Sequence, residues 1–163
     1  MSIFRRWGVE PIINASGAVT RLGGAPMSDE TLDAFRLAAA DSVPLEFLQA
    51  AASRQLSHWT GAEAGLVTSG AAAGLTLGAA AILARFDLGR MERLPDCSGF
   101  PHEFVVPREQ RNGYDHAVRA AGARLIEVGF QEIVAGAGVR RCEAWEIAAA
   151  IGPSTAGVLY VHD

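Results

Sequence analysis

The 163-residue sequence contains no lysine, and all fourteen of its basic residues are arginines. Lysine is the side chain that forms imines with carbonyl compounds in enzymes, whereas the arginine guanidinium stays protonated and does not react in this way. The absence of lysine therefore excludes imine chemistry on the side chains of this sequence. A function that depends on such chemistry has to account for an amine that the sequence does not contain.

An excess of positive charge and a cysteine motif are lacking as well. The formal net charge is −4, and the arginines are interspersed with acids, which argues against a nucleic-acid partner. Cys97 and Cys142 lie far apart, and no apolar secretory leader is recognisable, so we expect a reducing compartment and a cytoplasmic protein. The four histidines and two cysteines form no four-ligand spacing, so we expect no metal site.

One uncharged stretch, residues 64–84, is long enough to cross a bilayer. It consists mostly of alanine and glycine, includes serine and threonine, and opens with a strand and a turn. This pattern favours a helix buried inside an α/β protein over a membrane span. We expect no membrane partner.

Apolar runs alternate with helical patterns along the sequence. Ser28 followed by two acids is a helix start, and later segments show helical periodicity. We expect helices over residues 28–40, 45–60, 71–85, 115–122 and 142–151, and strands over residues 65–68, 104–106, 124–128 and 157–161. We expect irregular structure over residues 86–101 and a loop over residues 129–138. Because the strands are apolar throughout, we predict an α/β fold with a mostly parallel sheet and helices on both faces.

The turn at Ser69 and Gly70 joins an expected strand to the start of an expected helix. Free backbone N–H groups and the positive end of the helix dipole meet at such a point, which predicts a phosphate site. Ser69 adds a hydroxyl, and Gly70 lets the backbone approach a ligand closely. The P-loop, dinucleotide and nucleophile-elbow patterns are not matched here.

Five motifs, in order along the chain, resemble the selenocysteine synthase-like group of fold-type I pyridoxal-phosphate enzymes. They are INASG (13–17), RLGGAP (21–26), TGAEA (60–64), TSGAAAG (68–74) and RNGYDHAVRAAGA (111–123). The last two are especially similar to the branch with D-glucosaminate-6-phosphate ammonia-lyase and seryl-tRNA selenium transferase-like proteins. The motifs are specific for the group and not for a substrate.

The resemblance implies the aspartate-aminotransferase-type fold, with pyridoxal 5'-phosphate as cofactor. Its phosphate cup falls on Ser69, Gly70 and Ala71. The position that stacks on the pyridine ring is Gln110, where many relatives have a histidine or another aromatic residue. The N-terminal loop resembles the substrate-proximal loop of the family, which implies that Asn14, Ser16 and Arg21 bind the substrate. The family pattern also includes Asp115 and His116, for which a helix-start role and a catalytic role both remain open.

The resemblance further implies residues 1–60 as a loop-and-helix arm of the active site and interface, and residues 61–163 as an incomplete cofactor-binding large domain. The family's Schiff-base lysine and pyridine-binding aspartate follow the strand at 157–161, so the catalytic residues are unknown here and we expect an incomplete chain. We expect a lyase or transferase acting at the α and β carbons of a small amino-acid or amino-sugar-phosphate substrate. We also expect a homo-oligomer, or association with a missing C-terminal half. The alternatives are an inactive fragment or split subunit serving as a binding module, and a phosphate-binding α/β domain that does not use pyridoxal.

Overall fold

The computed structural model describes residues 2–129, 133–134, 138–139 and 141–162. The chain divides into two units, Met1–Ala51 and Ala52–Asp163, each of which is described by itself. The division falls inside helix α2 (Leu45–Thr60), nine residues before the expected boundary at residue 60. The functional roles expected of the two parts remain predictions.

The first unit is built from short helices. It contains the 3-10 helices η1 (Ile3–Trp7) and η2 (Thr20–Leu22), helix α1 (Asp29–Ala38) and the start of α2. The Ser28 hydroxyl accepts a hydrogen bond from the Thr31 N–H at 3.2 Å, which confirms the predicted helix start. No described residue of this unit is buried.

The segment after α2 does not join the sheet, so the strand predicted over residues 65–68 is wrong. Helix α2 ends at Thr60 and is followed by Gly61, which has a positive φ of 73°. The Gly65 N–H then donates to the Ser53 hydroxyl of α2 at 3.0 Å. A Cβ at Gly65 would lie 2.6 Å from Leu56 Cδ1. The apolar run does make close contacts at its start, but they are with a helix and not with a neighbouring strand.

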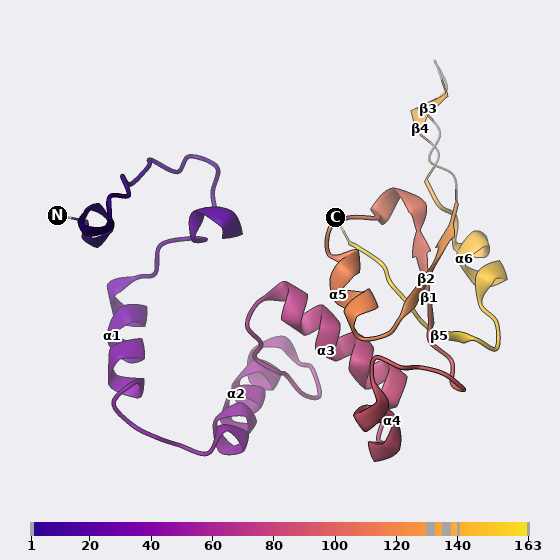
Figure 1. The fold of residues 1–163 in the computed structure, drawn as a ribbon, viewed down its shortest axis with the longest axis horizontal. Helices are drawn as coiled ribbons and strands as arrows, with labels where there is room; N and C mark the ends of the chain where they lie inside the picture. The colour runs from indigo at the N-terminus through magenta and orange to yellow at the C-terminus, as the bar shows by residue number, and fades with distance from the viewer. Residues whose placement is uncertain (1, 130–132, 135–137, 140, 163) are drawn as a thin grey trace. The chain divides into compact units, whose positions relative to one another are not determined.

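A three-stranded parallel sheet forms the centre of the second unit (Figure 1). Its strands are β1 (Glu103–Pro107), β2 (Arg124–Val128) and β5 (Thr155–Val158), in the order β2-β1-β5. The last strand begins two residues earlier than predicted and ends at Val158. The Leu159 N–H still donates to Val105 O at 2.8 Å, just beyond that end. In the stretch expected as a loop, β3 (Ile133–Val134) and β4 (Gly138–Val139) pair antiparallel, and the rest of 130–137 lies outside the described residues.

Helices cover both faces of this sheet, which confirms the predicted fold class. Helix α6 (Ala144–Ala150) packs on β1 and β2, while α3 (Ala71–Ala84) packs on α5 (Asp115–Ala120) and β5, on the opposite side (Figure 1). The buried core joins α3, β1 and α5 through Leu83, Phe104 and Val118. Helix α4 (Leu88–Arg93) lies in the stretch expected to be irregular.

Helix α4 was not predicted because its six residues are too few to show helical periodicity. The Asp87 carboxylate accepts a hydrogen bond from the Arg90 N–H at 3.1 Å, which caps its first turn. Within the described residues, no helix combines the length and apolarity that a membrane crossing requires.

Candidate functional site

Helix α3 starts at a glycine that leaves its first turn open. Gly70 has φ 104° and ψ 174°, and no described side chain caps the helix there. Its carbonyl accepts hydrogen bonds from the Gly74 N–H at 3.1 Å and the Thr68 hydroxyl at 3.0 Å. The N–H groups of the first turn have no acceptor within the helix. A Cβ at Gly70 would meet nothing within 4 Å, and anions such as phosphate are the ligands that free N–H groups at a helix start bind.

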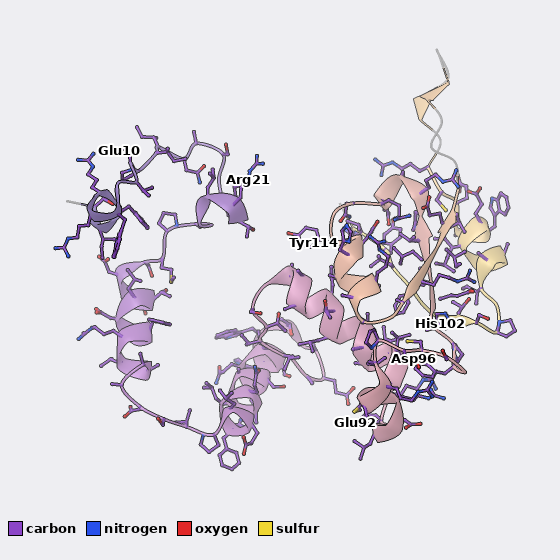
Figure 2. All side chains as sticks on the ribbon, in the orientation of Figure 1. Glu10, Arg21, Glu92, Asp96, His102 and Tyr114 are labelled. Atoms are coloured by element: carbon purple, nitrogen blue, oxygen red, sulfur yellow. The ribbon has the colours of Figure 1, made fainter. Side chains whose placement is uncertain are left out.

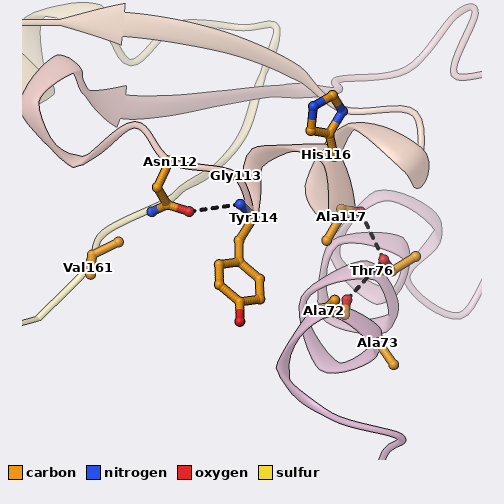
Figure 3. A pocket seen from close by; sticks show the side chains of 9 residues that line it. All are labelled: Ala72, Ala73, Thr76, Asn112, Gly113, Tyr114, His116, Ala117 and Val161. Atoms are coloured by element: carbon orange, nitrogen blue, oxygen red, sulfur yellow. Dashed lines mark hydrogen bonds between the residues drawn. The ribbon is translucent and has the colours of Figure 1, made fainter. Parts of the chain in front are cut away.

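A hollow of about 830 Å³ lies between α3 and α5 (Figure 3). One wall comes from the first turns of α3, and the other from the turn at residues 112–114 and the start of α5. Its lining residues are Ala72, Ala73, Thr76, Asn112, Gly113, Tyr114, His116, Ala117 and Val161. Neither Ser69 nor Gly70 lines it.

The turn that carries Asn112 and Tyr114 is shaped by the Asn112 side chain. Its Oδ1 accepts from the Tyr114 N–H at 2.8 Å, and its Nδ2 donates to Gln110 O at 3.0 Å. The turn follows the carboxyl end of β1, which is the edge where open parallel sheets bind ligands. Both residues lie in the motif at 111–123, and neither Asn112 nor Tyr114 was assigned to a site from the sequence. An Asn-Gly pair just after a core strand was the available signal.

Two further hollows share residues with the first. One, of about 260 Å³, is lined by Ala71, Leu75, Asn112, Tyr114, Asp115, Leu159, Tyr160 and Val161. The other, of about 420 Å³, is lined by Glu109, Gln110, Arg111, Asn112, Arg141, Cys142, Tyr160 and Val161. Asn112 and Val161 line all three. The structure thus places the predicted cofactor residues Ala71 and Gln110 on neighbouring hollows at one edge of the sheet.

Gln110 is held by the backbone of a distant residue. Its Nε2 donates to Val161 O at 3.1 Å, and its Oε1 accepts from the Val161 N–H at 2.8 Å. Both bonds lie at the edge of the amide group, so they fix its plane and leave its faces uninvolved. This geometry is compatible with the predicted stacking on a ring, which remains a prediction.

A network of ion pairs holds the residues on either side of the turn at residues 112–114. Arg111 binds the buried carboxylate of Asp115 and also Glu127, while Arg108 Nε lies 3.2 Å from Glu127 Oε2. The hydrogen bond to Asp115 raises the pKa of Arg111 above its ordinary value. Asp115 therefore has a structural partner at the start of α5. Its neighbour His116 lines the largest of these three hollows, with Nδ1 3.0 Å from Arg119 Nη2.

The predicted substrate residues belong to the first unit. Asn14 and Arg21 line a hollow of about 840 Å³ within it, and Ser16 does not. Asn14 closes a turn, because its side chain accepts from the Ser16 N–H at 2.9 Å and donates to Gly17 O at 2.7 Å. Arg21 lies on η2 (Figure 2). Their roles in substrate binding remain predictions.

The described part of the chain contains no cluster of side chains that could bind a metal ion. There, no group of three or more histidine, cysteine, aspartate or glutamate side chains lies close enough to hold an ion.

The chain is similar to two enzymes over nearly its whole length. It is 32% identical over 164 residues to a D-glucosaminate-6-phosphate ammonia lyase of Salmonella typhimurium, a match that covers 98% of this chain and 42% of that enzyme. It is also 32% identical over 163 residues to a 5'-C-glycyluridine monooxygenase-decarboxylase of a Streptomyces species, covering 97% of this chain and 39% of that enzyme. No family model matches the sequence.

The fold also matches a solved structure. The structure of a D-glucosaminate-6-phosphate ammonia-lyase superposes with a TM-score of 0.90 at 31% identity, over the whole of this chain and 43% of the other. The chain is thus homologous to these enzymes and spans about two fifths of their length.

Proposed function

We propose that this chain forms the phosphate-binding part of a pyridoxal-phosphate-dependent lyase or transferase of the selenocysteine synthase-like group. The observation that carries this proposal is the open start of α3 at Gly70, beside hollows that Ala71 and Gln110 line. The similarity to a D-glucosaminate-6-phosphate ammonia lyase supports the lyase assignment.

The residues present suit the cofactor's two ends. Backbone N–H groups from Ala71 onward, with the Ser69 hydroxyl, would bind the phosphate, and Gly70 would admit it close to the backbone. Gln110 would lie flat against the pyridine ring, its plane fixed by Val161. When bound, pyridoxal phosphate supplies an electron sink for negative charge at a substrate carbon next to nitrogen.

The proposed substrate is a small amino acid or a phosphorylated amino sugar. Arg21 would bind its carboxylate or phosphate, because arginine forms paired hydrogen bonds with both groups. Asn14 and Ser16 would complete that loop. The acidic net charge disfavours a tRNA-linked substrate, which would call for a basic surface.

The absence of lysine favours a second candidate function. Without lysine, this chain would act on its own only as a cofactor-binding or interaction module, and an amine for covalent attachment would come from outside this sequence. We place the complete activity, whether elimination or replacement, with an assembly that supplies that lysine.

The surface of the first unit supports a protein partner. Large apolar side chains are exposed there, among them Trp7 at 81%, Ile13 at 98% and Phe35 at 70%. Large apolar side chains that are left exposed gain free energy when a partner covers them. We propose that a second copy of this chain, or a polypeptide with the remaining part of the enzyme, covers it, in the cytoplasm.

Absorbance titration with pyridoxal phosphate, followed by borohydride, tests this function. We expect saturable binding of pyridoxal phosphate, weaker binding of pyridoxal without its phosphate, and no covalent fixation by borohydride. Equal binding of the two compounds would contradict the phosphate site. A covalent adduct would show that the N-terminal amine reacts, since the sequence has no lysine.

A further inference from the structure

Asn112 and Gly113 form a reactive pair that the cofactor proposal does not use. Asn112 is exposed, and its Oδ1 accepts a hydrogen bond from the Tyr114 N–H at 2.8 Å (Figure 3). Because Oδ1 reaches the residue two positions ahead, the side-chain amide is folded back over the peptide bond between Asn112 and Gly113. The turn thus brings the side-chain carbonyl carbon, Cγ, toward the Gly113 nitrogen.

The Gly113 nitrogen has no competing hydrogen bond. Among the residues that the structure describes, no acceptor binds its N–H. Glycine has no side chain to hinder an approach, and a Cβ built at Gly113 would meet nothing within 4 Å, so this side of the turn is open. The hydrogen bond from the Tyr114 N–H would stabilise the negative charge that develops on Oδ1 when Cγ is attacked.

We propose that Asn112 is a site of spontaneous modification, at which water replaces the side-chain amide by a carboxylate. The Gly113 nitrogen forms a bond to Asn112 Cγ, its proton passes to the departing amide, and ammonia leaves, which gives a cyclic imide. Water then opens this ring. Cleavage of the new bond to Cγ gives aspartate, whereas cleavage of the original peptide bond gives isoaspartate. Overall, one water is consumed, one ammonia is released, and nothing is oxidised or reduced.

The modification puts a negative charge at the candidate cofactor site. Asn112 lines all three hollows there, and the new carboxylate is ionised at neutral pH. It would repel an anion such as the phosphate of the cofactor. The Nδ2 that donates to Gln110 O at 3.0 Å is also lost, so the segment with the predicted ring-stacking residue loses a hydrogen bond. This consequence rests on the proposed function, whereas the modification itself does not.

Asn14, the other asparagine of this chain, provides an internal control. Its side chain forms the same kind of turn, because Oδ1 accepts from the Ser16 N–H at 2.9 Å and Nδ2 donates to Gly17 O at 2.7 Å. The residue that follows it is Ala15, whose Cβ hinders ring closure. We therefore expect Asn112 to convert at least about tenfold faster than Asn14.

Mass spectrometry of the full chain tests this proposal. The folded chain is incubated in mildly alkaline buffer below its melting temperature, and its peptides are searched for the mass increase that accompanies the change from an amide to a carboxylate. We expect this increase in the peptide with Asn112, and Gly113→Ala, whose Cβ the open turn accommodates, should slow it at least about tenfold. The proposal is overturned if Asn112 and Asn14 convert equally fast, if Gly113→Ala converts like the parent chain, or if Asn112 converts only in urea.

Absorbance titration with pyridoxal phosphate tests the consequence for the cofactor. Asn112→Asp, which is one of the two products, should bind pyridoxal phosphate at least about threefold more weakly than the parent chain. Gln55→Glu adds the same charge at an exposed position of α2 outside the three hollows, and it should bind like the parent. Equal binding by Asn112→Asp and the parent would overturn the effect on the cofactor. A parent chain that converts at Asn112 but binds no pyridoxal phosphate would remove the proposed function and support the modification.

Discussion

The Thr76 hydroxyl joins helices α3 and α5 at the hollow of about 830 Å³ that lies between them. Its Oγ1 lies 2.9 Å from Ala117 O on α5 and 3.1 Å from Ala72 O on α3 (Figure 3). The contact spans 41 residues of sequence and is partly buried. It fixes the distance between the helix that starts at Gly70 and the helix that follows Tyr114.

Replacing Thr76 by valine should loosen this junction. Valine has the same shape but no hydroxyl, so Ala117 O loses its donor, and we expect the free energy of unfolding to fall by about 1 kcal/mol. Urea denaturation measures this change. Thr76→Ser, which retains the hydroxyl, should lose less than half as much, and equal losses would show that the methyl group and not the hydrogen bond matters.

Gly70→Ala should weaken both the fold and cofactor binding. The backbone at φ 104° and ψ 174° is a conformation that only glycine adopts without strain, at a cost of about 1–3 kcal/mol for other residues. A Cβ would meet no atom within 4 Å, so the loss would be conformational and not a clash. We expect weaker pyridoxal phosphate binding in the absorbance titration.

The matched control for that variant lies on the same helix. Gly78 is inside α3, has an ordinary helical φ and has open space where the methyl group of an alanine would lie, so Gly78→Ala should stabilise the chain by about 0.5–1 kcal/mol. Its cofactor affinity should equal that of the parent chain. If both variants bound the cofactor equally well, the Gly70 turn would not be the phosphate site.

Asp115→Ala should destabilise the chain strongly. The Asp115 side chain is only 6% exposed and binds Arg111, so its removal leaves a partly buried guanidinium with one carboxylate fewer. We expect a loss of about 3 kcal/mol in the free energy of unfolding. Glu127→Gln, at the 38% exposed end of the same network, should cost less than about 1 kcal/mol. Similar losses for the two variants would contradict the role of burial.

The thiol of Cys97 should resist alkylation in the folded chain. Burial, followed by the negative charge of Asp96, raises its pKa above the ordinary 9.0. A raised pKa means that the neutral thiol stabilises the fold fully below pH 9.0, and that this contribution is lost as the pH rises through the folded-state pKa. In a Cys142→Ser variant, mass spectrometry should detect iodoacetamide modification at about pH 8 only after urea is added. Rapid labelling without urea would show that Cys97 is accessible.

The sequence predicted the elements whose signals are local. Ser28 indicated the start of α1, and the apolar run at residues 104–106 indicated β1. The strand at residues 65–68 failed because an apolar run does not reveal its partner, which is α2 and not another strand. Strand β5 was placed too late because the apolar run at residues 158–161 dominates the pattern, whereas the strand begins at Thr155, directly after a turn.

The candidate site shows the same difference between local features, which the sequence revealed, and features that depend on long-range packing, which it did not. The Ser69-Gly70 turn was recognised because its chemistry lies in consecutive residues. Asn112 and Tyr114 were missed as lining residues because they reach the hollow only through the packing of α5 on α3. The bond of Gln110 to Val161, across 51 residues, leaves no periodic trace in the sequence.

Helix α1 has no buried residue, and this bears on how the chain melts. A helix of ten residues without a core behaves like a peptide in water, where each turn forms at the expense of chain entropy and its ends fray. Its Ser28 cap and first-turn acids then supply much of its order. The residues around it should lose helicity gradually on warming, below the sharp transition of the sheet, so that the calorimetric and spectroscopic melting curves of this chain do not coincide.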